Sequence, residues 1–330
     1  MSDVLRQAKE QVLKWQKLSQ TADLTALKAG FESCMSEDYL WRGMHPFHEQ
    51  HGADSVIASF YTPFIHAFTS LQRRQDMFFA GKNEIDGFQS VWVASMGHFM
   101  GLFDQPFLGI PPHHKIAMIR YAEFHKVEGG KITETALFID LLHLMAQAGI
   151  TPISQQTGIH LIQPGPLTHD GLLFDTQDKQ AGISTLALIN RMIGDINQGQ
   201  YATPQEELKQ CWHDDMLWWG PTGIGATYTI DRYIEQHQRP FRTQNKDRRF
   251  NGHICRMAEG NYGGFFGWPN LSIRPTGGYL GMPAFSEYAD MRVVDFYRRD
   301  GDKLAENWIF IDMLHFLNMQ GIDILGQIQR

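Results

Sequence analysis

Two short segments each carry an acid in a setting where it could act as a base. In RYAEFHKV, Tyr121, Glu123 and His125 alternate with apolar residues, and RVVDFYRR places Asp295 and Tyr297 in the same register. Successive side chains of a strand point to opposite faces, so each set shares one face. A carboxylate walled by apolar side chains loses hydration and its pKa rises toward neutrality. We therefore predict Glu123 and Asp295 as general bases.

A plainer interpretation of these acids remains open. Each follows an arginine by three residues, Arg120 or Arg292, and a strand carboxylate can pair with such a side chain or face water. The presence of an acid in both segments favours the catalytic hypothesis.

The surroundings of the two acids differ. Near Glu123 the candidates for relaying a proton are Tyr121, His125, His45 and His98, whereas Asp295 has mainly aromatic neighbours. An acid that abstracts a proton still needs a donor for the oxyanion that forms. We therefore expect the first segment to carry the activity, with Tyr297 as a donor if the second does.

Several aromatic residues could line a pocket for a small molecule. Trp41 and Trp218 stand at matching places in the chain, and Trp92, Tyr262 and Trp268 fall in regions of strand pattern. Aromatic side chains at an apolar rim are typical of such sites, although they are equally typical of an ordinary core. We list all five as candidate binding residues.

The motif HPFHEQH suggests a metal site, with His45, His48 and His51 spaced by three. Pro46 and Gly52 argue against one continuous helix and favour a loop. We therefore expect no metal here, and predict His45 as a hydrogen-bonding group of the pocket.

Asp140 and Asp312 precede two apolar helical patterns, each with a histidine three residues later, His143 or His315. The pattern predicts that each aspartate caps a helix, which contributes about 1 kcal/mol. A cap can also face a cavity, so both are secondary candidates for the binding site.

The elements that must position these residues occur twice. ALFIDLLHLMAQAGI at 136–150 resembles WIFIDMLHFLNMQGI at 308–322, an offset of 172, and EDYLWRG at 37–43 resembles DDMLWWG at 214–220, an offset of 177. A repeat of this length indicates a duplicated domain rather than a solenoid unit. We expect one domain over 1–150, a linker over 151–178 rich in Pro, Gly, Gln and Thr, and a second domain over 179–330.

Each half follows the same order of patterns. Helices are expected at 3–18 and 23–36, and again at 180–197 and 204–213. Alternating apolar runs then predict strands that end in a glycine hairpin, EGGK or DGDK, before a last strand and helix.

The composition places the protein among ordinary globular chains. Of 330 residues 43% are hydrophobic and 20% charged, with a net charge of −7 and no apolar run long enough for a membrane span. Scattered basic residues argue against nucleic-acid binding. Three cysteines without a CxxC pair, and a start without a signal-peptide pattern, favour the cytoplasm.

The ordered set GIPPHHKI, EFHKVEGGKITE and the glycine-ended helix after it resembles the SnoaL-like polyketide cyclase family, and the second half resembles it too. This resemblance implies the nuclear transport factor 2-like fold: an α+β cone in which a curved antiparallel sheet holds its helices. Two such cones in one chain imply an intrachain pseudo-dimer that packs sheet against sheet.

The resemblance also implies chemistry without a metal or an organic cofactor, a ring-closing aldol reaction in polyketide or secondary metabolism. The family's catalytic aspartate corresponds to Leu137 and Ile309, neither of which can move a proton. Its assisting histidine corresponds to Glu123 and Asp295, which places both acids over the implied pockets.

We therefore predict a small-molecule enzyme that acts on a mostly apolar carbonyl or ester compound as a cyclase, isomerase, dehydratase or hydrolase. The alternatives are a binding protein with the same pockets and no turnover, or one half that serves only as the partner of the other. No GxGxxG, P-loop, GxSxG or HExxH motif occurs, so we expect no nucleotide cofactor. The protein is expected as a monomer with an internal pseudo-dimer or as a homodimer.

Overall fold

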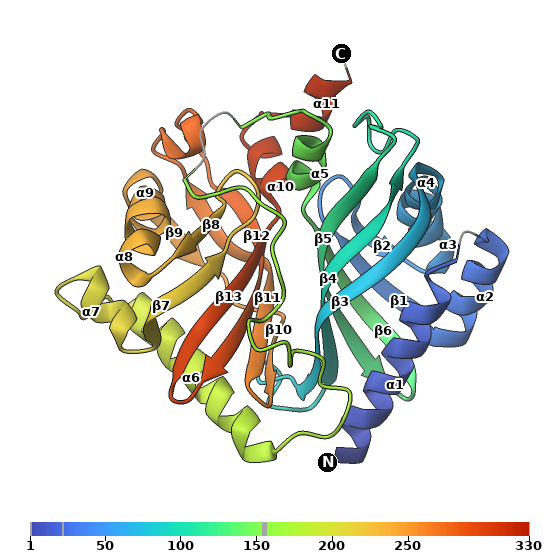
Figure 1. Cartoon of the computed structure of the whole chain (residues 1–330), viewed down its shortest axis with the longest axis horizontal. Helices are drawn as coiled ribbons and strands as arrows, with labels where there is room; N and C mark the ends of the chain where they lie inside the picture. Colours follow the sequence, from blue (N-terminus) through green and yellow to red (C-terminus); the bar gives the residue numbers. More distant parts are fainter. Residues whose placement is uncertain (1, 22, 154–156, 330) are drawn as a thin grey trace.

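The computed structural model describes residues 2–21, 23–153 and 157–329; residues 154–156 of the predicted linker lie outside this range, as do residues 1, 22 and 330. The chain is a mixed α+β structure with two curved sheets that face each other, and most helices lie on the outer sides (Figure 1). We call residues 1–150 the first half, 151–178 the connecting segment and 179–330 the second half.

The first half begins with helices and continues into strands. Its helical elements are α1 (Ser2–Leu18), α2 (Leu24–Cys34), α3 (Ala53–Val56), the π-helical turn η1 (Ile57–Tyr61), α4 (Thr62–Ala67) and α5 (Leu141–Gln147). Its strands are β1 (Met35–Gly43), β2 (His48–His51), β3 (Phe68–Lys82), β4 (Val91–Phe103), β5 (Ile116–Glu128) and β6 (Lys131–Ile139).

The second half repeats this order. Its helical elements are α6 (Lys179–Gln198), α7 (Pro204–Lys209), α8 (Ile230–Tyr233), the π-helical turn η2 (Ile234–Gln238), α9 (Arg239–Gln244), the short 3₁₀ turn η3 (Tyr279–Gly281), α10 (Met313–Asn318) and α11 (Ile324–Ile328). Its strands are β7 (Trp212–Trp219), β8 (Ala226–Tyr228), β9 (Asp247–Phe250), β10 (Cys255–Glu259), β11 (Tyr262–Arg274), β12 (Ala289–Asp300) and β13 (Lys303–Ile311).

The two sheets share one strand order. The first runs β2-β1-β6-β5-β4-β3, and the second runs β8-β7-β13-β12-β11-β10, with β9 beside β11. The sequence predicted antiparallel sheets, but each contains one parallel pair, β1 with β6 and β7 with β13. The reason is that the first strand of each half follows the helices and enters the sheet beside the last strand in the same direction.

Local signals in the sequence account for the helix ends. Asp140 accepts a hydrogen bond from the backbone N–H of His143, and Asp312 accepts one from His315, so both predicted caps are confirmed. Both helices are followed by a glycine with positive φ, Gly149 and Gly321, which the helix stop requires.

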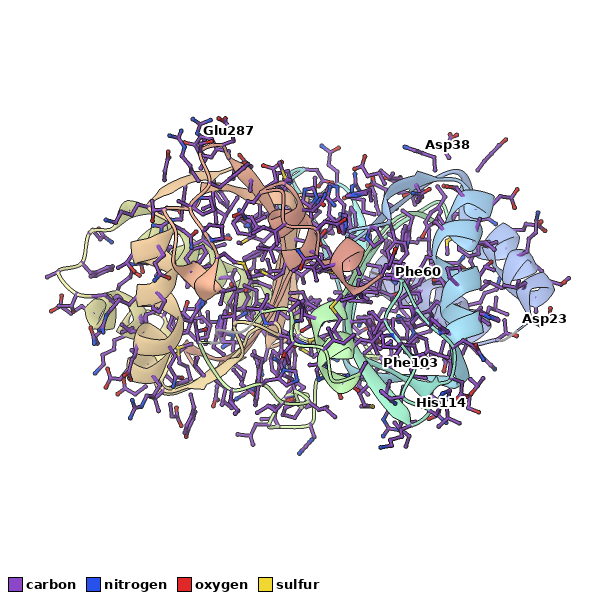
Figure 2. The ribbon with its side chains drawn as sticks, turned by 90° about the horizontal axis from the view of Figure 1, so that it is seen from above. Asp23, Asp38, Phe60, Phe103, His114 and Glu287 are labelled. Atoms are coloured by element: carbon purple, nitrogen blue, oxygen red, sulfur yellow. The ribbon has the colours of Figure 1, made fainter. Side chains whose placement is uncertain are left out.

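The outward faces of the two sheets pack against each other. This layer is apolar and aromatic, and ring pairs cross it, such as Phe124 stacked on Phe296 at 5.3 Å and Phe79 edge-on to Phe296. Figure 2 shows side chains filling the space between the two halves. Burial of this face leaves the opposite, concave face of each sheet to enclose the helices and any pocket.

Each of the two capping aspartates also accepts a hydrogen bond from the other half of the chain. The second carboxylate oxygen of Asp140 accepts from the backbone N–H of Thr222 at 2.9 Å, and that of Asp312 accepts from His45 at 2.9 Å. Each aspartate therefore caps its own helix and binds the loop that follows the first strand of the other half.

The connecting segment is paired with both sheets. Residue 172 forms a bridge with Phe78 of β3, and Ile159 forms one with Ala226 of β8. Its backbone thereby covers part of one edge strand of each sheet, which would otherwise expose unpaired hydrogen-bonding groups. Within the described residues, no helix has the length and apolar character that a membrane crossing requires.

Candidate active site

The concave face of the second sheet encloses a cavity of about 560 Å³. Strands β11, β12 and β13 form its floor, and α6, α7 and the helices around η2 form its walls (Figure 1). Most of the lining is aromatic or aliphatic, including Trp212, Trp218, Phe241, Phe265, Val293 and Ile309. A largely apolar cavity with a few polar groups is the usual form of a small-molecule site.

Asp295 lies in this cavity without a cationic partner among the described residues. Its side chain accepts a hydrogen bond from the Asn307 amide at 2.9 Å. Burial raises the pKa of Asp295 to about 7, and the hydrogen bonds from Asn307 and Tyr297 only partly oppose this rise. The carboxyl group can therefore gain or lose a proton near neutral pH, as the sequence predicted for this position.

A buried imidazole faces the same cavity. His237, in η2, stacks on Trp218 with ring centroids 4.0 Å apart, and its Nδ1 has no hydrogen-bond partner among the described residues. Burial lowers the pKa of His237 to about 3, so the ring is neutral at neutral pH. Its free nitrogen can bind a carbonyl or hydroxyl oxygen of a molecule in the cavity.

Basic side chains complete the lining. Arg242 and Arg248 both border the cavity, and Arg242 is already paired with Glu207 at 2.7 Å. Arg248 Nη1 donates to the backbone oxygen of Asn245 at 3.0 Å, which leaves its other nitrogens free for a polar end of a ligand.

The corresponding acid of the first half is in a different state. Glu123 is fully buried and forms an ion pair with Arg73, at 2.5 Å between Oε2 and Nη1, and its Oε2 also lies 3.4 Å from His125 Nε2. Burial alone would raise the pKa of Glu123, but Arg73 and His125 outweigh it and hold that pKa at about 2. The prediction of a raised pKa at Glu123 is therefore wrong.

Other side chains of the first interior contact Arg73 and the inward face of β5. The Arg73 guanidinium lies 4.7 Å from the ring centres of both Phe99 and Tyr121, and the Tyr121 hydroxyl is 3.0 Å from Ser95. His125 Nδ1 is bound to Thr135 at 2.9 Å. Glu123, Tyr121 and His125 do share one inward face, but they form a packed polar network.

Strand registers explain why the acids differ. In the first sheet Arg73 of β3 pairs with Phe99 of β4, which pairs with Ile119 of β5. In the second sheet Phe250 of β9 pairs with Leu271 of β11, which pairs with Met291 of β12. Ile119 and Met291 correspond by the offset of 172. Phe250 therefore occupies the position of Arg73, so the second sheet has no cation to reach its acid from there. Val293, at the position of Tyr121 by the offset of 172, leaves more free space beside Asp295.

Four predicted binding residues lie on the wrong face for the cavity. Trp92, Tyr262 and Trp268 belong to the layer between the sheets, where Trp268 is covered by the Arg292 guanidinium at 3.9 Å. His98 shares the face of Trp92 on β4 and lies 3.5 Å from Asp76. The reason is strand alternation, which turns these side chains outward from the concave face.

The remaining predicted binding residues lie in three different parts of the structure. Trp218 and Tyr297 line the cavity, as predicted. Trp41 is buried in the first core against Phe47 and Phe60. His45, Asp140 and Asp312 lie at the contact between the halves and not in the cavity.

Sequence reasoning missed His237, Asn307 and Phe250. A signal was present, because the offset of 177 aligns His237 with Phe60 and Phe250 with Arg73, and the offset of 172 aligns Asn307 with Thr135. The first two of these pairs differ in polarity, and such differences indicate where the interiors of the two halves differ in chemistry.

Comparison with known proteins agrees with the geometry of the first half. Residues 11–148 match the family model described as SnoaL-like polyketide cyclase. This part of the chain is therefore similar to the SnoaL-like polyketide cyclase family, and the second sheet lies outside the matched range. No curated protein matches the chain.

Solved structures to which the chain is similar include a SnoaL-like protein from Jannaschia sp. CCS1, which is 20% identical over 46% of this chain and 98% of its own, with a TM-score of 0.38. A nuclear transport factor 2-like protein from Burkholderia thailandensis E264 is 19% identical over 43% of this chain and 96% of its own, with a TM-score of 0.32. Another, from Burkholderia xenovorans LB400, is 11% identical over 42% and 97%, with a TM-score of 0.34.

Proposed function

We propose that the chain is a cofactor-free enzyme in which Asp295 takes a proton from a carbon next to a carbonyl group of a mostly apolar compound. The observation that carries this proposal is the unpaired, buried Asp295, with its pKa raised to about 7, in an apolar cavity of about 560 Å³. A base is most useful when its pKa lies near the working pH. Cyclisation, isomerisation and dehydration can all begin with this step, whereas ester hydrolysis would use the same carboxylate to take a proton from an attacking water.

The chain's own residues can serve each part of the step. When Asp295 removes the proton, negative charge moves to the carbonyl oxygen, which needs a hydrogen-bond donor. His237 can supply one from its free Nδ1 in the tautomer that is protonated there, and the Tyr297 hydroxyl is a second candidate. The protonated Asp295 then returns the proton to carbon or to a leaving oxygen.

The second half is proposed to be a second SnoaL-like domain, which makes the protein an intrachain pseudo-dimer of two cones. The shared strand order, the reciprocal contacts of Asp140 and Asp312, and the π-helical turns at 57–61 and 234–238 support this proposal. We assign the chemistry to this second half, against the expectation from sequence, because Glu123 is held by Arg73. The three cysteines are free and buried, which fits the expected cytoplasmic location.

Deuterium exchange tests the function without knowledge of the natural substrate. The protein is incubated with 2-tetralone, an apolar bicyclic ketone, in heavy water, and deuterium uptake next to the carbonyl is followed by proton NMR. We expect the wild type to accelerate uptake, with a rate that rises with pH up to a plateau above about 7. Asp295→Asn should lower the acceleration by about 100-fold or more.

The matched control is Asp300→Asn, which removes an exposed carboxylate near the end of the same strand. It should leave exchange unchanged. If the wild type binds the ketone in equilibrium dialysis but exchanges no faster than buffer, the protein is a binding protein for such compounds. Equal exchange by Asp295→Asn and the wild type would refute the role of Asp295.

A further inference from the structure

A second cluster of polar side chains lies where the two halves meet, outside the cavity. His45 and His48 come from the loop and strand after β1, and His315 comes from α10 of the second half. One ring nitrogen of each lies within 4.8 Å of the others, and no other group of three such ligands is found in the part of the chain that the structure describes. We propose that these three histidines bind a divalent metal ion of the zinc class.

Two of the imidazoles have a nitrogen that needs a partner. The Nδ1 atoms of His45 and His315 are buried, and neither forms a hydrogen bond with any of the residues that the structure describes. A buried polar atom in this state costs free energy, and such atoms usually mark a missing ligand, water or ion. A metal ion between the rings would supply the partner for both.

The rings are arranged to converge. His45 and His48 have ring centroids 5.3 Å apart at 78°, and His48 and His315 are 5.6 Å apart at 73°. In a tetrahedral zinc site, with metal–nitrogen distances of about 2.1 Å, nitrogens lie about 3.4 Å apart. Small side-chain rotations would therefore complete the site.

The backbone around the ligands is fixed by one carboxylate. Asp312 accepts from the backbone N–H of His45 at 2.9 Å and from that of His315 at 3.1 Å. Groups that position metal ligands in this way raise affinity by limiting their motion. His48 has a φ of 54°, a conformation uncommon outside glycine that is often retained at functional positions.

The kind of ligand decides which metal ions suit the site. A set of nitrogen ligands suits zinc, copper, nickel or cobalt rather than magnesium or calcium.

Arg292 limits the affinity of the three histidines for a metal ion. Its Nη1 lies 3.2 Å from His48 Nδ1 and 3.3 Å from Asp312, so a metal ion has to displace the guanidinium from His48 or bind beside it. The ion pair with Asp312 offsets much of this positive charge. We therefore expect binding in the micromolar range rather than the tight binding of a structural zinc site.

The other side of the contact provides a comparison within the same chain. There Asp140 contacts Thr222 at the position that corresponds to His45, and His143 faces His160 with ring centroids 5.0 Å apart. Among the described residues no group of three converging ligands is found at this place, so it should bind zinc more weakly. The proposal does not depend on the function assigned to Asp295.

Titration of the full chain with zinc chloride after dialysis against a chelator tests the site. We expect one zinc ion per chain, a cobalt(II) absorption spectrum typical of tetrahedral nitrogen ligation, and a rise in Tm, because the ligands come from both halves. His48→Ala and His315→Ala should each lower the zinc affinity by about 100-fold or more, beyond the loss seen for outer positioning groups.

The control is His51→Ala, which belongs to the same sequence motif but not to the cluster, and it should bind zinc like the wild type. Near-UV circular dichroism checks the fold of each variant, and His48→Gln replaces any variant that fails to fold. Absence of stoichiometric zinc binding by the wild type would overturn the proposal. So would equal binding by the wild type and the folded His48 and His315 variants.

Discussion

Replacing Asp295 by asparagine should stabilise the folded protein above neutral pH. In the wild type the folded protein holds the Asp295 proton far more tightly than the unfolded chain does, because the pKa is raised from its ordinary value of 3.8 to about 7. The contribution of this group to stability therefore falls as pH rises from about 4 to about 7. Asparagine keeps the shape and the contact with Asn307 but carries no charge to bury.

The size of the effect follows from the pKa. A pKa difference of one corresponds to about 1.4 kcal/mol, so the wild type loses about 4 kcal/mol across this pH range through Asp295. Asp295→Asn should thus match the wild type within about 1 kcal/mol near pH 4 and exceed its free energy of unfolding by up to about 4 kcal/mol near pH 8.

Urea unfolding followed by tryptophan fluorescence at pH values from 4 to 8 measures this difference. Asp300→Asn, an exposed site on the same strand, is the control and should show no such pH dependence. If Asp295→Asn is less stable than the wild type at pH 8, or if the difference does not change with pH, Asp295 is not a desolvated, unpaired acid and the argument fails.

Three other changes test the contrast between the halves. Glu123→Gln should destabilise the protein by about 3–5 kcal/mol in urea unfolding at pH 7, because it leaves Arg73 buried without its partner; stability unchanged at pH 7 would contradict the ion pair. Phe250→Arg should place a cation where Arg73 stands in the first sheet, lower the pKa of Asp295 and move the rise of the exchange rate to lower pH; an unmoved profile would refute the register. Asp140→Ala should cost about 2 kcal/mol in the same unfolding assay, through loss of a helix cap and of the contact between the halves, and no loss would show that these bonds contribute little.

Features set by local sequence were predicted well. The caps at Asp140 and Asp312 and the inward face shared by Glu123 and His125 depend on neighbours a few residues away. Alternation in a strand and the needs of a helix end are enough to predict such features. The α+β fold class was implied by the resemblance to the SnoaL-like polyketide cyclase family, and the mixed α+β structure agrees with it.

The pKa shifts of Glu123 and Asp295 could not be predicted from local sequence patterns. Glu123 is controlled by Arg73, which comes from a strand 50 residues earlier, and no local pattern shows that their side chains meet. The cavity depends on differences in volume between facing positions, such as Val293 against Tyr121. Both are properties of packing between distant elements, and only the structure shows them.

Some aromatic residues that were predicted to line pockets lie instead in the layer between the two sheets. Trp92 and Trp268 were predicted to line pockets, but a strand that is buried on both faces gives no sequence signal for which face borders a pocket. The irregular register between Gly267 and Leu271 adds to this uncertainty along β11. The grouping of His315 with His45 and His48 could not be predicted from sequence either, because these residues meet across the contact between the halves.

The central claim is that Asp295 takes up a proton near neutral pH inside the second cavity. The most direct test is a pH titration of its side-chain carboxyl carbon by NMR, with ¹³C-labelled aspartate and the signal assigned by its absence in Asp295→Asn. The account predicts a titration midpoint near pH 7. A midpoint below about 5, within the range of ordinary aspartates, would contradict it.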